Sequence, residues 1–322
     1  MTPRMRVILM DVSSVAYQTK YTLGDMTGPD DLPTGILFGM LSRILSLGFR
    51  YKTNQFVFCF DSPSGQGHRK AIYPEYKSNR TPMEAEEKRA RRQMYREINV
   101  LRNFTLPCIG FKNLQYEMGF EADDLIASQI ITTPGFKFVM CTSDHDMFQL
   151  LESGRVVMTR APAIRNPRGR PDSPGDITEE SFTREKGISP RKWAMVKAIA
   201  GCASDTVEGI IGVGEGTAIK YINDDLPPHY KSFLAITSPM GQDTIKRNQK
   251  LVTLPYYGCP ADELHPDEFS KKGFWTVCRK YGLATFREST MKAKWACFFR
   301  GDFSEGDDVV DPPAGRIRRR TK

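Results

Sequence analysis

The sequence lacks any apolar run near the roughly 18 residues needed to cross a membrane. Asp11 interrupts the apolar stretch from Val7 to Met10, so we expect neither a signal peptide nor a membrane anchor. Only four histidines are present, and the seven cysteines form no CxxC pair. These shortages argue against a disulfide framework and a zinc site, and they predict reduced thiols in a cytoplasmic protein.

Length and composition are those of a globular chain. The 322 residues suit one large domain or two modest ones, with 40% hydrophobic and 26% charged residues. The net charge of +8 favours polyanionic partners. Basic residues concentrate at 69–102, with ten Lys or Arg against five Glu, and at 155–170, with five Arg and no acid. A phosphate backbone would suit both stretches, but a solvated helix face and loop would give the same pattern.

Three short apolar runs each lead into an aspartate. Residues 7–10 precede Asp11, residues 56–60 precede Asp61, and residues 136–141 precede Asp144 after Thr142 and Ser143. Continuous apolar runs separated by helical segments predict an α/β fold with a central, mostly parallel sheet flanked by helices. Ligands bind such sheets beyond the carboxyl ends of the strands, so the three acids should face one crevice. Helix capping would explain one of them, but hardly three.

A long helix is predicted between the second and third strands. Thr81 is the expected N-cap, Pro82 the first helical residue, and Glu84 completes a capping box. The second half carries Met94, Ile98 and Leu101 at core spacing, whereas the first half should stand in solvent. The preceding segment mixes cations with rings and is expected to be mobile; it contains Arg69, Lys70, Tyr73, Tyr76, Lys77 and Arg80.

Acids also crowd the first turn of the helix predicted at 121–131. Glu121, Asp123 and Asp124 lie there, and a helix N-terminus favours negative charge by about 0.3 to 1 kcal/mol each. That effect accounts for one or two acids. Three acids beside the strand-end aspartates would repel one another unless a cation neutralised them.

The region from Ile177 onward is different in kind. One helix is expected from about Ile177 to Lys186, and a second is expected to begin at Ser189 and Pro190. Glycines follow at 209, 212, 214 and 216. With no strand before it, this is not a dinucleotide fingerprint. A glycine hairpin that leads into a helix at Glu215 offers backbone amides to an anion, for which duplex phosphates are our interpretation. After Asn223 we expect helices whose residues serve to pack the core.

The acids expected at the crevice are all hard oxygen ligands, which suit Mg²⁺ or Mn²⁺. They are Asp11, Asp61, Glu121, Asp123, Asp124, Asp144, Asp146 and Asp205. This number implies two ions, a pairing that performs in-line displacement at phosphorus by water. No GxSxG elbow supports a serine hydrolase triad. Lys70, Lys77 and Arg80 could supply the catalytic cation that stabilises the scissile phosphate.

These motifs together resemble a known family. The order FDSP, RKAIYPEYKSNR, GFEADDLIA, TSDHDMFQLL and GCASDTVEGIIGVGEGTA over residues 6–222 resembles the 5′-nuclease superfamily of flap endonucleases and 5′ to 3′ exonucleases. A chain of this size looks most like the bacteriophage members, rather than the domain fused to bacterial DNA polymerase. The location would then be the bacterial host cytoplasm.

The resemblance implies a PIN-like fold, with a catalytic region at 1–160 that includes a helical arch at about 69–103. It implies a helical region at 161–300 with a helix-hairpin-helix element at about 177–223. The composition of residues 301–322, acidic and then basic, predicts a flexible tail. Asp11, Asp61, Glu121, Asp123 and Asp124 would surround the first metal, and Asp144, Asp146 and Asp205 the second. Lys77 and Arg80 would stand at the base of the arch.

The same resemblance implies removal of RNA primers and 5′ flaps from branched or duplex DNA and RNA-DNA hybrid during replication. The nucleic-acid-binding residues would be Arg69, Tyr76, Gly209, Gly212, Gly214, Gly216 and Thr217. The glycine hairpin would bind K⁺ through backbone carbonyls. A monomer is expected, with a polymerase or a single-strand-binding protein as possible partners.

One departure from the family pattern matters for the metals. GDxSDN usually supplies two acids, whereas this chain has Cys202 where the first acid would be, which predicts a weaker second metal. Two alternatives stay open: a catalytically inactive branched-DNA-binding protein with the same fold, and a PIN-type ribonuclease. In the tail, Arg316 to Lys322 would either add non-specific DNA affinity or simply aid solubility.

Overall fold

A five-stranded parallel sheet forms the centre of the computed structural model, which describes residues 5–24, 26–78, 84–159 and 175–304. The strands are β1 (Arg6–Asp11), β2 (Phe56–Cys59), β3 (Leu114–Gln115), β4 (Lys137–Cys141) and β5 (Val156–Thr159). They lie in the order β3-β2-β1-β4-β5, and every pairing is parallel. The predicted α/β class is confirmed, and the three strands that lead into aspartates are neighbours.

Alternate residues of β1 enter two different cores, because successive side chains of a strand point to opposite faces. Val7 and Leu9 pack on one face of the sheet, and Ile8 and Met10 pack on the other. All four are buried. A strand covered on both faces has no polar alternation, which is why these strands appear in the sequence as continuous apolar runs.

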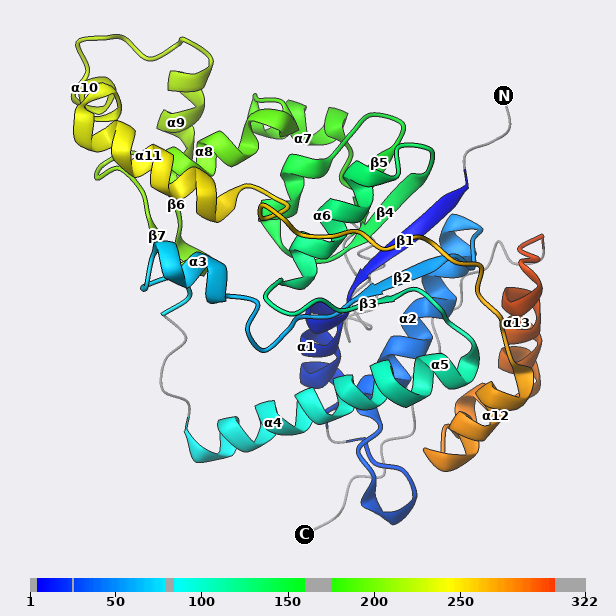
Figure 1. Cartoon of the computed structure of the whole chain (residues 1–322). Coiled ribbons are helices and arrows are strands. Elements are labelled where there is room, and N and C mark those ends of the chain that lie inside the picture. The colour runs from blue at the N-terminus through cyan, green and yellow to red at the C-terminus, as the bar shows by residue number, and fades with distance from the viewer. Residues whose placement is uncertain (1–4, 25, 79–83, 160–174, 305–322) are drawn as a thin grey trace, which may run out of the picture.

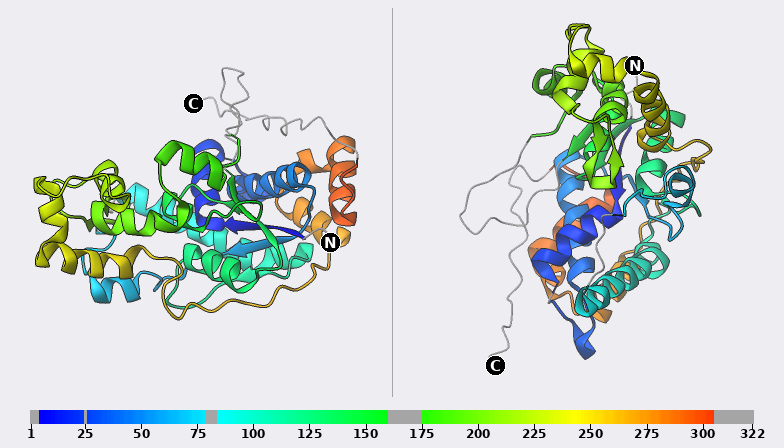
Figure 2. Two further views of the ribbon diagram at one scale, coloured as in Figure 1. Left: turned by 90° about the horizontal axis from the view of Figure 1, so that it is seen from above. Right: turned by 90° about the vertical axis from the view of Figure 1, so that its left-hand side faces the viewer.

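Helices cover both faces of the sheet (Figure 1). One core contains α1 (Val12–Leu23), α2 (Gly35–Tyr51), α12 (Lys271–Lys280) and α13 (Ser289–Arg300). The other contains α6 (Ala122–Thr132), α8 (Trp193–Ala200) and α11 (Pro239–Val252). The helical region expected over 161–300 is therefore divided between the faces, and Figure 2 shows α10 and α11 at the opposite end of the molecule from α12 and α13.

The remaining elements are short apart from α4. They are α3 (Gly67–Ile72), α4 (Ala85–Val100), α5 (Leu106–Ile109), α7 (Glu179–Lys186), α9 (Glu215–Ile222), α10 (Lys231–Thr237), β6 (Gly201–Cys202) and β7 (Val207–Glu208). Short 3-10 helices include η3 (His145–Leu150), η4 (Pro190–Lys192) and η5 (Ala203–Asp205). Within the described ranges, no helix combines the length and the apolar character that a membrane span requires.

Helix α4 is amphipathic only in its second half, as predicted. Its buried residues are Met94 and Ile98, while residues 84–89 are exposed. The described helix begins after Glu84; the expected cap at Thr81 and Pro82 lies outside the described residues, as do Arg160 to Arg170 and the tail from residue 305. The prediction that the segment before α4 is mobile is wrong for residues 69–77, because side chains of α3 and of the turn after it are buried in the molecule.

Asp267 predicts a pH-dependent stability. Its Oδ1 accepts a hydrogen bond from the backbone N–H of Lys112 (2.8 Å), and burial raises the pKa of its carboxyl group to about 7. The unfolded chain ionises this group near pH 4, so the stability it confers is complete below about pH 4 and is lost as pH rises through about 7. Asp267→Asn keeps the acceptor and removes the titration.

We expect urea unfolding to show that the wild type loses about 1 to 3 kcal/mol between about pH 4.5 and pH 8 relative to Asp267→Asn. The difference between the two proteins cancels the titration of every other group. Parallel pH profiles for the two proteins would show that the folded state does not hold this proton.

Candidate metal centre and nucleic-acid interface

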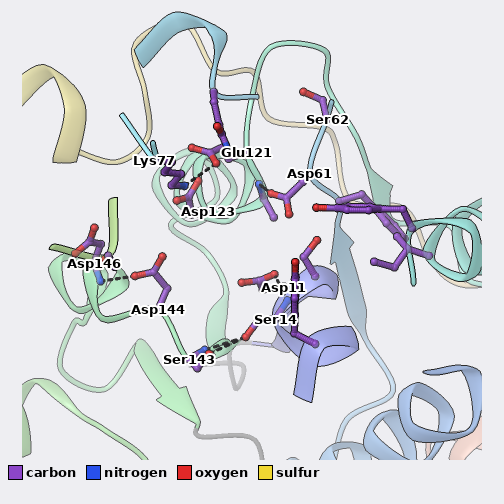
Figure 3. Close-up of a pocket in the computed structure, with 18 of the residues that line it drawn as sticks. Asp11, Ser14, Asp61, Ser62, Lys77, Glu121, Asp123, Ser143, Asp144 and Asp146 are labelled. Atoms are coloured by element: carbon purple, nitrogen blue, oxygen red, sulfur yellow. Dashed lines mark hydrogen bonds and ion pairs between the residues drawn. The ribbon is translucent and has the colours of Figure 1, made fainter. Parts of the chain in front are cut away.

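The parallel sheet brings three aspartates to one edge. Asp11 ends β1, Asp61 follows β2, and Asp144 follows β4, and all three line one cavity of about 1020 Å³. Local hydrogen bonds orient two of them: Asp11 accepts from Ser14 N–H (2.9 Å) and the Thr142 hydroxyl (2.9 Å), and Asp61 accepts from Ala122 N–H (2.8 Å). Figure 3 shows these carboxylates directed toward a common space.

Two further acids enter the cavity from the start of α6. Glu121 is the N-cap of this helix and Asp123 lies in its first turn, as the sequence predicted. The Asp123 carboxylate accepts a hydrogen bond from Asp124 N–H at 2.7 Å. Together with the strand-end aspartates nearest to them, they form what we call the first acid group: Asp11, Asp61, Glu121 and Asp123.

The second acid group consists of Asp144, Asp146 and Asp205. Asp146 lies in η3, where its N–H donates to Asp144 Oδ1 (2.8 Å), and Asp205 arrives from η5 between β6 and β7. All three line the same cavity as the first acid group. Residues separated by almost 200 positions in the sequence therefore meet at one place.

Burial raises the pKa of five of these carboxyl groups. Desolvation and the nearby Asp61 raise the pKa of Asp11 to about 7. Burial, followed by the charges of Asp124 and Glu121, raises the pKa of Asp123 well above its usual value. Burial likewise raises the pKa of Asp144, Asp146 and Asp205. Seven converging carboxyl groups outnumber the two lysines that pair with them, and such a set of oxygen ligands fits divalent cations, which would relieve the repulsion among them.

Lys77 lies inside the crevice beside both acid groups, where the sequence placed it. Its Nζ lies 2.7 Å from Glu121 Oε1 and 3.7 Å from Asp205 Oδ1. Burial acts to lower the pKa of Lys77, but Glu121 and Asp205 outweigh it and leave the pKa raised. The ammonium group therefore stays charged beside the place where a phosphate would enter.

Tyr76 is not available for stacking, which corrects its expected role. The side chain is buried, and its hydroxyl lies 3.0 Å from Glu121 Oε2 and 3.3 Å from Asp205 Oδ2. A base could not reach the ring. Tyr76 instead positions one acid of each group.

Arg69 and Asp124 form a buried ion pair. The predicted contact of Arg69 with nucleic acid and the predicted metal ligand at Asp124 are therefore both wrong. Arg69 is 1% exposed and Asp124 is 0% exposed. Asp124 accepts two hydrogen bonds from the guanidinium, at 2.7 and 2.8 Å, and others from the N–H groups of Tyr256 and Glu121. Both oxygens of Asp124 are therefore occupied and it does not line the cavity, while Arg69 cannot reach a nucleic acid.

The other two expected cations are not in the described site. Lys70 is exposed on α3 and does not line the cavity, which contradicts a catalytic role. Its neighbour in the helix, Arg69, is the residue that turns inward. Arg80 lies outside the described residues.

Lys197 is a site residue that sequence reasoning missed. Its Nζ lies 3.7 Å from Asp146 Oδ1 and 2.9 Å from Glu215 Oε1, and it lines the cavity. The signal was a single cation in the otherwise apolar helix WAMVKAIA. An isolated charge on a buried helix usually has a partner, and here the partner is the second acid group.

Comparison with known families identifies this arrangement. The family model described as 5′-3′ exonuclease, N-terminal resolvase-like domain, matches residues 6–185. The chain belongs to this exonuclease family. The match contains β1 to β5, both faces of the sheet and six of the seven acids, all except Asp205.

Relatives of this exonuclease domain occur alone and within longer proteins. DNA polymerase I of Caldicellulosiruptor bescii is 28% identical over 260 residues, which are 78% of this chain and 29% of the polymerase. The chain thus spans less than a third of that relative. The 5′-3′ exonuclease of Buchnera aphidicola is 28% identical over 68% of this chain and 70% of its own length.

A solved structure shows the same fold. The D15 flap endonuclease of bacteriophage T5, solved in complex with DNA and metal ions, superimposes with a TM-score of 0.59 at 16% identity. The match covers 92% of this chain and 99% of the T5 chain. The match shows a shared fold, and the expected closeness to the bacteriophage members, rather than to the polymerase-fused domain, stays a prediction.

The exonuclease fold also contains the predicted glycine hairpin. It joins α8 to α9, with β6 and β7 paired antiparallel. Gly209 packs so closely that an added Cβ would lie 2.2 Å from the backbone carbon of Ala200, so its role is structural. Gly212 has φ +79°, and Gly212, Gly214 and Gly216 are exposed with open space around them. Thr217 is half-buried in the first turn of α9.

The arch side of the cavity has an aromatic and basic wall that the sequence analysis did not single out. Arg91 and Tyr95 of α4 line it, together with Tyr17 of α1, Arg102 and Tyr116. The Arg102 guanidinium lies 3.7 Å from the centre of the Tyr116 ring. The wall thus combines positive charge with ring faces, the two features that hold single-stranded nucleic acid.

Proposed function

We propose that the chain is a divalent-metal-dependent nuclease that hydrolyses phosphodiesters at 5′ ends, 5′ flaps or RNA primers of branched and duplex DNA. The observation that carries the proposal is the convergence of seven carboxylates, from five separate parts of the sequence, on one cavity beside a charged lysine. Membership of the 5′-3′ exonuclease family and the likeness to a DNA-bound and metal-bound flap endonuclease support it.

The two acid groups would hold two ions, Mg²⁺ or Mn²⁺. When bound, the ions would supply charge neutralisation and an activated water for in-line displacement at phosphorus. The first acid group offers four carboxylates, and the second offers three and Lys197 as a neighbouring cation. Lys77, between the groups, would orient the scissile phosphate through its charge. The side chains of Tyr76 and Arg69 hold the acids in place from behind.

Two surfaces would hold the nucleic acid on either side of this centre. The wall formed by Tyr17, Arg91, Tyr95, Arg102 and Tyr116 would accept the unpaired 5′ strand. The exposed glycine hairpin would hold the duplex phosphates through backbone N–H groups, with K⁺ bound by its carbonyl oxygens. A monomeric state, and a polymerase or single-strand-binding protein as partner, belong to the same proposal.

A product map tests the proposal. Flap, nicked and RNA-primed duplexes labelled at either the 5′ or the 3′ end are incubated with the chain and Mg²⁺. We expect products cut near the junction of single strand and duplex, and no reaction in chelator. Binding without cleavage would support an inactive DNA-binding protein, and faster cleavage of single-stranded RNA would support a PIN-type ribonuclease.

A further inference from the structure

Cys202 faces the second acid group although it is buried. The residue is 1% exposed, and its Sγ lies 3.4 Å from Asp146 Oδ2 and 3.0 Å from Ser204 Oγ. The short β6–β7 pairing fixes its backbone, because Cys202 pairs with Val207. Cys202 belongs to one of the hydrophobic cores, but its sulfur also contacts the oxygen atoms of Asp146 and Ser204, which a thiol that only filled a core would not do.

Cys202, Asp146 and Asp205 can reach one ion together. One ligand atom from each lies within 4.8 Å of the other two. Tetrahedral Zn²⁺ forms bonds of about 2.3 Å to sulfur and about 2.0 to 2.2 Å to oxygen, which places the two ligand atoms about 3.6 Å apart. The observed distance between Cys202 Sγ and Asp146 Oδ2 is 3.4 Å, close to that value. Lys197 contacts the other oxygen of Asp146, at 3.7 Å, and leaves Oδ2 facing the sulfur.

The donor set differs in chemistry from the first acid group. Asp11, Asp61, Glu121 and Asp123 offer only carboxylate oxygens, which suit Mg²⁺. A thiolate is a poor ligand for Mg²⁺ and a good one for Zn²⁺ and cations of similar softness. The charges of Lys77 and Lys197, which flank the cluster, limit the repulsion among its anionic ligands.

We propose that Asp146, Cys202 and Asp205 form a mixed sulfur and oxygen site that takes a borderline divalent cation such as Zn²⁺ or Co²⁺ in preference to Mg²⁺. When the cation binds, the S–H bond of Cys202 breaks, the proton passes to solvent, and a metal–sulfur bond forms. The inference rests on the proposed function, since it names the metal of the second acid group. It gives this chain one hard and one softer metal position.

Cobalt absorption tests the site without any cleavage assay. The metal-free full chain is titrated with Co²⁺, and a sulfur-to-cobalt charge-transfer band is expected to grow to one equivalent. Cys202→Ser and Cys202→Asp should both lose the band, and Cys202→Asp should bind Co²⁺ at least about tenfold more weakly at this site. Cys259→Ser is the matched thiol control and should keep the band, because Cys259 Sγ contacts the Pro260 carbonyl instead.

A second measurement needs no variant. The ¹¹³Cd resonance spectrum of the wild type should contain one signal displaced toward the range of sulfur ligands and one in the range of oxygen ligands. Absence of the cobalt band in the wild type, its persistence in Cys202→Ser, or two oxygen-type cadmium signals would each overturn the inference. If flap DNA is still cleaved with Mg²⁺ in those cases, the proposed function stands and only the mixed metal site is refuted. A cobalt band in a wild type that does not cleave flap DNA would support the mixed metal site and contradict the proposed function.

Discussion

Replacing Asp123 by asparagine is expected to lower the rate of flap cleavage by about 10²- to 10³-fold while DNA binding is retained. Asp123 lies in the first acid group, where it would share in holding the metal, but it does not belong to the aromatic and basic wall. Single-turnover cleavage in Mg²⁺ and fluorescence anisotropy with labelled flap DNA in Ca²⁺ measure the two properties separately.

The same variant should be more stable than the wild type in metal-free buffer near neutral pH. Burial and the charges of Asp124 and Glu121 raise the pKa of Asp123, so its ionisation destabilises the folded state as pH rises. Asparagine removes that charge. Asp225→Asn, at an exposed position, is the control and should change neither activity nor stability. An Asp123→Asn protein that cleaves normally would remove Asp123 from the metal centre.

Arg69→Ala is expected to destabilise the protein by about 3 to 5 kcal/mol. The guanidinium donates two hydrogen bonds to Asp124, lies 3.4 Å from Glu121 and donates to the carbonyl of Leu251. Removing it leaves a fully buried carboxylate without its cation. Urea unfolding monitored by circular dichroism measures the loss, and the midpoint should shift strongly.

Lys70→Ala is the matched control for this change. It removes a cation one position along the same helix, but from an exposed side chain, so we expect a change within about 0.5 kcal/mol. An Arg69→Ala protein with normal stability and weakened DNA binding would restore the interpretation of Arg69 as a nucleic-acid contact. Equal effects of the two substitutions would contradict the buried pair.

Sequence patterns predicted the three central strands of the sheet, though not β3 and β5, and most of the acids of the candidate metal centre. Continuous apolar strands lose their alternation only when both faces are covered, so the strands before Asp11, Asp61 and Asp144 predicted a parallel sheet and a shared edge. The start of α6 was also predicted correctly, because Glu121, Asp123 and Asp124 directly precede the apolar residues of this helix.

The errors concern residues whose surroundings come from distant parts of the chain. Composition cannot distinguish Arg69 from Lys70, yet 55 positions later Asp124 draws Arg69 into the core and leaves Lys70 in solvent. Tyr76 is buried for the same reason, through Glu121 and Asp205. Likewise, no local pattern shows that α12 and α13 return to the face of the sheet that α2 covers.

The backbone N–H of Lys77 donates a 2.7 Å hydrogen bond to the carbonyl of Asp205. This bond joins the segment that leads toward α4 to the turn between β6 and β7, from which the chain continues into the glycines at 209–216. If the wall and the glycines bind the 5′ strand and the duplex as proposed, a displacement of one segment would reach the other through the backbone of Asp205. Binding of the strand and binding of the duplex would then be coupled.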